Sequence, residues 1–180
     1  MSRFPKAYAD RVAKLRVPTG FLLVAAFAYM AQPTLRTFFW GVPIACIGLW
    51  LRGWAAGHLR KNQTLAQSGP YAYTRNPLYL GTLLVALGLA VAAKRPALAV
   101  LFSSVFYCVY LPVIELEQQH LAKLFPDFAA YAAKVPMIFP KLPEDPQPGS
   151  FDWSIYRKNR EYQALLGFLL GAAYLFWRAS

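Results

Sequence analysis

The sequence predicts an all-α integral membrane protein with about five transmembrane helices, and three observations support this fold class. Of the 180 residues, 57% are hydrophobic and only 15% are charged, whereas a soluble domain carries about 25% charged residues. The apolar residues come in long runs instead of alternating with polar ones, as membrane-spanning helices require. The net charge is +11, and its distribution follows the topology that these runs predict. The sequence therefore predicts a single membrane domain over residues 1–180.

The first segment, residues 1–16, is basic and contains one acidic residue. It is predicted to be a cytoplasmic tail. An interfacial helix is the alternative, because Tyr8, Val12 and Leu15 fall roughly on one helical face.

The first two spans are predicted within residues 17–58, over about 17–31 and 38–58. Arg52 lies inside the second span, where a charge is costly. Two interpretations remain open for this arginine. Its side chain extends to the inner face of the membrane, or it forms a buried pair with Glu115 or Glu117.

Residues 59–141 form the core of the chain, which begins with a polar loop over 59–76. The third and fourth spans are predicted over about 77–93 and 97–116, and Pro112 is expected to kink the end of the fourth. Only a short turn separates these spans, so they are predicted to be antiparallel neighbours.

The last part of the chain is predicted to be a Pro-rich linker and interfacial segment over 142–161, followed by a fifth span over 162–177. Glycines spaced by four residues occur in the second and fifth spans, a spacing that lets a neighbouring helix approach closely. The predicted partners are thus the bilayer and, through these small-residue faces, another copy of the chain. The glycines are Gly53, Gly57, Gly167 and Gly171.

The basic residues predict the orientation of these spans. Fourteen of the nineteen Lys and Arg residues fall on the segments on the same side as the N-terminus, and four fall on the opposite side, Arg52 lying within a span. Because positive residues concentrate on the cytoplasmic side, the N-terminus is predicted to be cytoplasmic. The same asymmetry explains the net charge without a nucleic-acid partner.

A junction of polar and aromatic residues connects the loop to the third span. It runs from Gly69-Pro70-Tyr71 to Arg75-Asn76-Pro77-Leu78-Tyr79. Pro77 suits the first turn of a helix and disfavours helical backbone at the residue before it. Asn76 is therefore predicted to cap the third span, where the helix dipole is positive.

A second group of polar residues follows the fourth span. Glu117 and His120 share a helical face, but one Glu-x-x-His pair is weak support for a metal site, and none is predicted. Tyr131 and Lys134 lie further along, just before Val135-Pro136.

In order and spacing, these two groups resemble a family of integral membrane methyltransferases. That family contains the isoprenylcysteine carboxyl methyltransferases and the phosphatidylethanolamine N-methyltransferases. The resemblance covers about residues 45–141. Asn76 stands where the carboxyl methyltransferases have His and where phospholipid methyltransferases also use Asn. Lys134 stands where Arg is common, and Leu116 separates Glu115 from Glu117 where the family has an adjacent Glu pair.

The resemblance implies methyl transfer from S-adenosylmethionine to a lipid or hydrophobic small molecule, with the cofactor pocket at the cytoplasmic membrane boundary. It implies Glu117 and Lys134 as catalytic residues. The implied cofactor-binding residues are Gly69, Tyr71, Arg75, Asn76, Pro77, Tyr79, Glu117 and Tyr131.

Two alternatives to an enzyme remain. The chain is a non-catalytic family member that only binds cofactor or lipid, or it is a component of a transporter. A transporter would more often show repeat symmetry or interrupted helices near the midplane, and the sequence shows neither clearly.

Overall fold

The structure is a computed structural model that describes residues 4–143 and 149–180. Every regular element in these two ranges is helical. The elements are α1 (Lys6–Met30), α2 (Leu35–Ala56), η1 (Gly69–Ala72), α3 (Pro77–Ala92), α4 (Pro96–Val105), η2 (Phe106–Tyr110), α5 (Leu111–Leu124), α6 (Phe128–Lys134), α7 (Trp153–Lys158) and α8 (Tyr162–Ala179).

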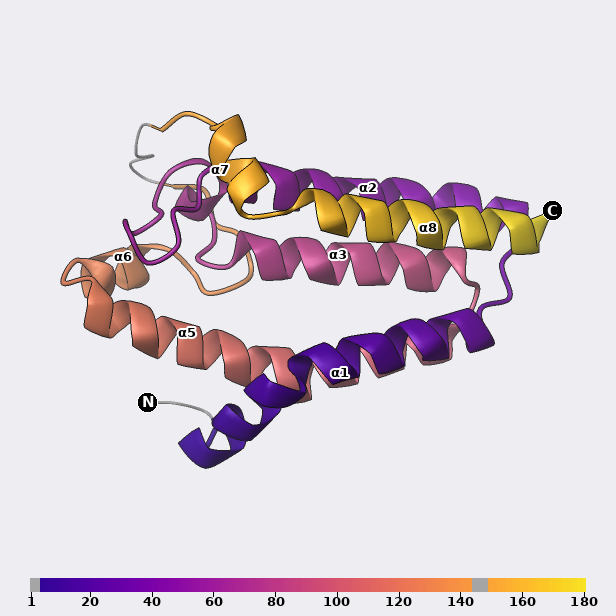
Figure 1. Ribbon diagram of the computed structural model, residues 1–180, viewed down its shortest axis with the longest axis horizontal. Helices are drawn as coiled ribbons and strands as arrows, with labels where there is room; N and C mark the ends of the chain where they lie inside the picture. Colours follow the sequence, from indigo (N-terminus) through magenta and orange to yellow (C-terminus); the bar gives the residue numbers. More distant parts are fainter. Residues whose placement is uncertain (1–3, 144–148) are drawn as a thin grey trace.

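The long helices extend along one common direction, and the short elements gather at one of their ends (Figure 1). Helices α6 and α7 and the loop that precedes α3 lie at this end. The C-terminus, the α1–α2 turn and the α3–α4 turn lie at the other. The predicted alternation of segments between two ends of a bundle therefore describes the fold correctly.

Three helical segments are long and apolar enough to cross a membrane: Lys6–Met30, Leu35–Ala56 and Pro96–Leu124. They overlap most of the predicted first, second and fourth spans. Helix α3 is apolar but has only 16 residues, and α8 is not among the three. Large apolar side chains such as Phe21, Trp40 and Leu170 are more than two-thirds exposed, as lipid-facing residues would be. Transmembrane roles for α3 and α8 stay predictions.

The first helix is longer than the predicted first span. It begins at Lys6 and runs past Pro18 as one helix, because Lys and Arg are good helix formers. Figure 1 shows the first turns of α1 inclined to the remainder, the bend expected of an internal proline. Val12 is buried, and the Tyr8 hydroxyl donates to the Cys108 carbonyl. Part of the face that the interfacial-helix alternative would place on the membrane surface thus contacts the protein instead.

The helix is distorted just before Pro112, and the distortion is a stretch of π-helix instead of the predicted kink. The segment η2 is a single stretch of π-helix that joins α4 to α5. A proline has no N–H with which to bond the carbonyl four residues earlier, which here is that of Cys108. The Tyr8 hydroxyl donates to this carbonyl at 2.7 Å. The wider turns of η2 and the hydroxyl from α1 together compensate for the missing bond.

Helices α2 and α3 pack closely through glycines that the sequence analysis did not single out. A Cβ on Gly48 would lie 2.6 Å from the Gly81 carbonyl oxygen, and a Cβ on Gly88 would lie 2.5 Å from the Ala45 nitrogen. The predicted glycine pairs differ from these. Phe151 and Tyr156 approach Gly57 and Gly53, respectively, whereas a Cβ on Gly167 or Gly171 would meet nothing within 4 Å.

Replacing Gly48 by valine is expected to lower the free energy of unfolding by about 1–3 kcal/mol, because the two backbones must separate to admit the side chain. Thermal unfolding in detergent measures this. Gly167→Ala is the control and should change stability by less than about 1 kcal/mol, since its surroundings are open. Equal stability of the two variants would show that α2 and α3 do not depend on this contact.

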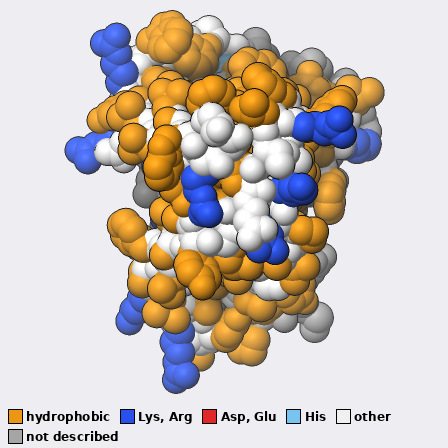
Figure 2. All heavy atoms as spheres, turned by 90° about the vertical axis from the view of Figure 1, so that its right-hand side faces the viewer, with side chains coloured by type: hydrophobic (Ala, Val, Ile, Leu, Met, Phe, Trp, Pro, Cys, Tyr) orange, Lys and Arg blue, Asp and Glu red, His pale blue; other side chains and the backbone are white. Residues whose placement is uncertain are grey.

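Figure 2 views the end of the bundle that carries the C-terminus. Lys and Arg side chains lie among hydrophobic ones there, and no Asp or Glu of the described residues is in view. The segments assigned to the opposite end also carry more basic than acidic residues, so both ends of the bundle are basic. The predicted orientation therefore depends on which end carries more basic residues, because the net charge has the same sign at both ends.

The structure describes only part of the predicted linker and interfacial segment. Residues 144–148, the centre of the Pro-rich stretch, lie outside the described residues. The following part contains α7, and the Asp152 side chain caps this helix by accepting from the backbone N–H groups of Ser154 and Ile155. Trp153 is two-thirds exposed at its first position.

Candidate active site

The loop before α3 and the segment that follows α6 hold each other in place. The backbone N–H of Arg75 donates to the Pro136 carbonyl at 2.9 Å, and the N–H of Lys141 donates to the Tyr73 carbonyl at 3.0 Å. The Thr74 hydroxyl donates to the Ile138 carbonyl at 2.9 Å. These bonds connect parts of the chain about sixty residues apart, so the two predicted groups of site residues form one structural unit.

Gly69 begins this unit for two physical reasons. Its φ of +58° is a conformation that favours glycine. A Cβ there would also lie 2.7 Å from Nε2 of His58. The His58 ring is fixed from its other side by a 3.0 Å hydrogen bond between Nδ1 and the Ser68 hydroxyl. Gly69 therefore shapes the loop, and the turn η1 follows directly from it.

Asn76 stands at the predicted N-cap position of α3, but its side chain makes no capping bond. The amide Nδ2 instead donates to the Met137 carbonyl at 2.8 Å. Asn76 is buried, and Pro77 behind it is fully buried. The predicted capping bond is thus wrong, because the amide donates to a part-buried backbone carbonyl across the junction instead.

Tyr71 and Tyr131 are buried against each other. The Tyr131 hydroxyl donates to the Tyr71 carbonyl oxygen at 2.7 Å. Burial raises the pKa of both phenols, so both stay neutral at physiological pH. The hydrogen bond between them joins α6 to the loop.

Replacing Tyr131 by phenylalanine is expected to destabilise the protein by about 1–3 kcal/mol, since the buried Tyr71 carbonyl loses its side-chain partner. Thermal unfolding in detergent measures the change. Tyr29→Phe is the matched control, because Tyr29 is 89% exposed. Unchanged unfolding in Tyr131→Phe would mean that the bond adds nothing to the junction.

Arg75 lies between the loop and α6. Its guanidinium carbon is 5.9 Å from the centre of the Phe128 ring, a cation–π distance. Burial lowers the pKa of this guanidinium. Its Nε and Oε1 of Gln118 are buried without a hydrogen-bond partner among the described residues. An unpaired buried donor of this kind is unusual and fits a ligand with an acceptor group.

Tyr79 and Glu117, both among the predicted site residues, form a hydrogen bond, and a third residue joins them. The Tyr79 hydroxyl donates to Oε1 of Glu117 at 2.8 Å. Nη1 of Arg16, from α1, lies 3.3 Å from the Tyr79 hydroxyl and 3.7 Å from the same carboxylate oxygen. The Glu117 side chain is 47% exposed, so a ligand can reach it.

These three residues line a cavity of about 640 Å³, here named the α3–α5 pocket. Side chains from α1, α2, α3, η2, α5 and α8 and from the loops at 59–62 and 159–161 form its walls. Its lining includes the cations Arg16, Arg52, Lys61 and Arg160 and the carboxylates of Glu117 and Glu161. The volume falls within the range of small-molecule and cofactor sites, about 300–1,000 Å³.

Arg52 lies in the same pocket and settles the interpretations left open by the sequence. Its partner is Glu161, just before α8, with Nε 2.5 Å from Oε1. Nη1 of Arg52 also donates to the Thr82 hydroxyl and the Leu78 carbonyl. The arginine therefore forms a buried pair, but with neither Glu115 nor Glu117.

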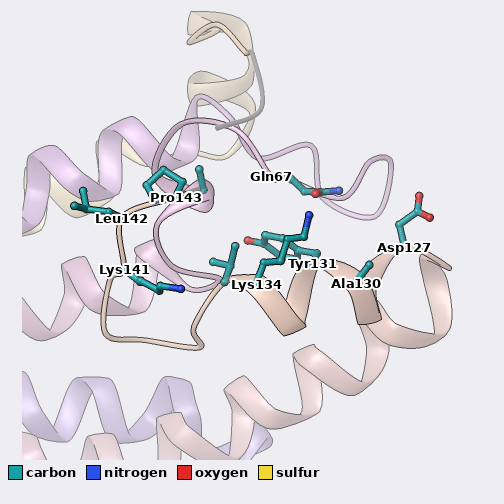
Figure 3. A pocket seen from close by; sticks show the side chains of 10 residues that line it. Gln67, Asp127, Ala130, Tyr131, Lys134, Lys141, Leu142 and Pro143 are labelled. Atoms are coloured by element: carbon teal, nitrogen blue, oxygen red, sulfur yellow. The ribbon is translucent and has the colours of Figure 1, made fainter. Parts of the chain in front are cut away.

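A second pocket of about 350 Å³, the α6 pocket, contains Lys134. Figure 3 shows Tyr131 and Lys134 on α6, with Gln67 of the loop opposite and Lys141 nearby. Lys134 does not line the α3–α5 pocket. The structure thus places the two predicted catalytic residues, Glu117 and Lys134, in separate cavities.

The sequence analysis missed several residues of the α3–α5 pocket. Arg16 was assigned to a tail, Glu161 to an interfacial segment, and Tyr110 to the interior of a span. Among the pocket residues outside the two predicted groups, only Arg52 could be singled out from the sequence, because it is a charge within an apolar run. Among the residues that the structure describes, no group of three His, Cys, Asp or Glu side chains is placed to hold a metal ion.

A family model described as phospholipid methyltransferase matches residues 37–127. The chain belongs to the phospholipid methyltransferase family. The match contains the junction, Arg52, Tyr79 and Glu117, and it confirms the resemblance found in the sequence.

Three relatives show how far the similarity extends. The cobalt-zinc-cadmium resistance protein CzcN of Cupriavidus metallidurans is 42% identical over 103 residues, which cover 57% of this chain and 47% of the relative. The nickel-cobalt-cadmium resistance protein NccN of Alcaligenes xylosoxydans xylosoxydans is 35% identical over 141 residues, covering 73% and 65%. The protein-S-isoprenylcysteine O-methyltransferase of Schizosaccharomyces pombe is 28% identical over 151 residues, covering 77% and 61%.

The matches span between about half and two thirds of the length of these relatives. No solved structure gives a significant match.

Proposed function

We propose that this protein transfers a methyl group from S-adenosylmethionine to a lipid or hydrophobic small molecule, with the reaction taking place in the α3–α5 pocket. The observation that carries the proposal is the hydrogen bond between Tyr79 and Glu117 in a cavity of about 640 Å³. Both residues lie in the part of the chain that matches the family.

The residues present fit such a cofactor. It would supply a methyl group on a sulfonium, together with an ammonium, a carboxylate and a ribose diol. Glu117 would accept a hydrogen bond from the ammonium or the diol, and the ring of Tyr79 would lie against the positive sulfonium. Arg75 has an unpaired Nε but does not line the α3–α5 pocket, so its role as a cofactor-binding residue stays a prediction. Gly69, Tyr71, Asn76, Pro77 and Tyr131 would set the position of these groups.

The chain's contribution to the reaction would be positioning and exclusion of water. The pocket would hold the acceptor atom in line with the methyl group at about 3–3.5 Å. An amine acceptor must lose its proton, and Glu117 and His120, which both line the pocket, are the candidate bases. A catalytic role for Lys134 remains a prediction, since this residue lines the α6 pocket.

The setting of the site is proposed to be the cytoplasmic boundary of the membrane. The junction, α6 and α7 lie at the end of the bundle opposite the C-terminus. By the count of basic residues along the sequence, this is the cytoplasmic end. The cofactor would enter from the cytosol and the acceptor from the bilayer.

Methyl transfer is tested by incubating the purified protein with S-adenosylmethionine that carries a labelled methyl group and with a membrane lipid extract. Label in the extracted lipid fraction is the expected result. Binding of the cofactor without transfer to any acceptor would favour the alternative of a family member that only binds. Neither binding nor transfer would contradict the proposal.

The metal-resistance names of two relatives add a cellular measurement. If resistance depends on methyl transfer, a strain that carries Glu117→Gln should be as sensitive to cadmium and cobalt as a strain without the gene. Resistance that persists in this variant would separate the phenotype from methylation.

A further inference from the structure

Arg52 and Glu161 form a second polar group in the α3–α5 pocket, besides Tyr79 and Glu117. The pair is well buried, with 21% of the arginine side chain and 10% of the glutamate side chain exposed. Helix α2 supplies the arginine, and the residue before α8 supplies the glutamate. Both line the same cavity as Tyr79 and Glu117.

Each member of this pair has hydrogen-bonding capacity that the protein leaves unused. Arg52 uses Nε for Glu161 and Nη1 for Leu78 and Thr82. Among residues 4–143 and 149–180, no partner contacts its Nη2, and none contacts Oε2 of Glu161. Neither atom is among the fully buried side-chain atoms that lack a partner. Both residues line the α3–α5 pocket, and the Nε–Oε1 bond holds the two side chains together, so the unused donor and acceptor belong to one ion pair at this pocket.

A cation and an anion fixed side by side complement a ligand that carries the opposite charges at the same spacing. The free Nη2 would donate to a carboxylate or phosphate oxygen, and the free Oε2 would accept from an ammonium. The burial of the pair strengthens both contacts, since water competes less there. A ligand with only one of these charges would leave the other half of the pair unmatched.

We propose that Arg52 and Glu161 bind a zwitterionic group, an ammonium next to a carboxylate or phosphate, in the α3–α5 pocket. The inference rests on the proposed function, because two ligands of that reaction class carry such a group. One is the amino-acid end of the cofactor. The other is the headgroup of a phospholipid that carries a primary amine.

The test uses Glu161→Gln in the full-length protein in detergent. Glutamine keeps an oxygen that can accept from Nε of Arg52 but removes the negative charge that an ammonium requires. Asp10→Asn is the charge-matched control, since Asp10 is exposed near the start of α1 and does not line the pocket. Unfolding temperatures of both variants are measured alongside.

Two pairs of probes distinguish the source of the zwitterion. S-adenosylhomocysteine carries the amino-acid end, and methylthioadenosine lacks it. Short-chain phosphatidylethanolamine carries the ammonium, and short-chain phosphatidylglycerol lacks it. Affinity for the zwitterionic member of one pair is expected to fall about tenfold or more, the effect of losing one charge-assisted hydrogen bond. Affinity for the other member should change by less than about twofold. The pair that responds identifies the occupant.

The proposal is overturned if a folded Glu161→Gln variant binds all four probes with wild-type affinity. It is also overturned if this variant loses affinity equally for both members of a pair. A wild-type protein that binds none of the probes also overturns it. If Glu161→Gln does not fold, Thr82→Val replaces it, because it keeps both charges and removes one contact of Arg52. This variant should weaken the same zwitterionic probe about twofold or more, and equal binding of that probe would contradict the proposal.

These outcomes separate the inference from the function on which it rests. Selective loss of phosphatidylethanolamine, with no binding of S-adenosylhomocysteine to wild type, would support the zwitterion site and contradict the methyltransferase proposal. Binding of S-adenosylhomocysteine that depends on Glu117 but not on Glu161 would do the reverse.

Discussion

Replacing Glu117 by glutamine is expected to lower kcat/KM for methyl transfer about a hundredfold or more. Glutamine preserves size and can still accept from the Tyr79 hydroxyl, but it removes the negative charge next to Arg16. If the carboxylate accepts the proton of the acceptor, the loss corresponds to the about 10²–10⁴-fold contribution of a general base. Initial rates at several cofactor and acceptor concentrations measure it.

Glu115→Gln is the matched control for this prediction. Glu115 lies two residues earlier on α5 and does not line the α3–α5 pocket. It should retain activity within about threefold of wild type. Comparable losses in both variants would indicate a general effect of charge on α5. A Glu117→Gln enzyme with normal kinetics would remove this carboxylate from the reaction.

The second large effect is expected from Arg52→Met, which should reduce the free energy of unfolding by about 3 kcal/mol or more. Methionine fills similar space but leaves the Glu161 carboxylate buried without its partner. Breaking a buried ion pair from one side typically costs about 3–5 kcal/mol. Thermal and denaturant unfolding in detergent measure the change.

The double variant Arg52→Met with Glu161→Met tests the origin of that loss. Removing both charges leaves no unpaired carboxylate, so much of the stability should return. The two residues would act independently if the double variant were less stable than Arg52→Met by the full effect that Glu161→Met has alone. Arg36→Met, on the first turn of the same helix, is the control for loss of a charge.

The sequence predicted the elements of the fold better than their contacts. The apolar runs and Pro77 placed α2 and α3 to within a few residues, because both signals are local. The start of α1 was placed too late, since a basic segment can continue an apolar helix as well as precede it. The helix that contains the predicted fourth span extends beyond it, since α5 continues to Leu124 with polar residues on one face.

The pairings of site residues depend on distances along the chain that no local pattern encodes. Arg52 and Glu161 are 109 residues apart, and Arg16 and Tyr79 are 63 apart. Asn76 shows the same limit within a short motif. Its position at the start of α3 was predicted, but its amide bonds a carbonyl 61 residues away instead of capping the helix. The motif residues were identified by type, and only the fold decides which pocket each one reaches.

The most direct test of the account is calorimetric binding of S-adenosylmethionine to the purified protein in detergent, with Asn76→Ala and Glu117→Ala alongside. Wild type is expected to bind the cofactor, and Glu117→Ala is expected to bind it about tenfold or more weakly. Asn76→Ala should also bind more weakly, through loss of the bond that joins the junction to Met137. If wild type fails to bind in detergent and again in lipid bilayers, the methyltransferase proposal is contradicted, and Tyr79 and Glu117 become a structural contact between α3 and α5.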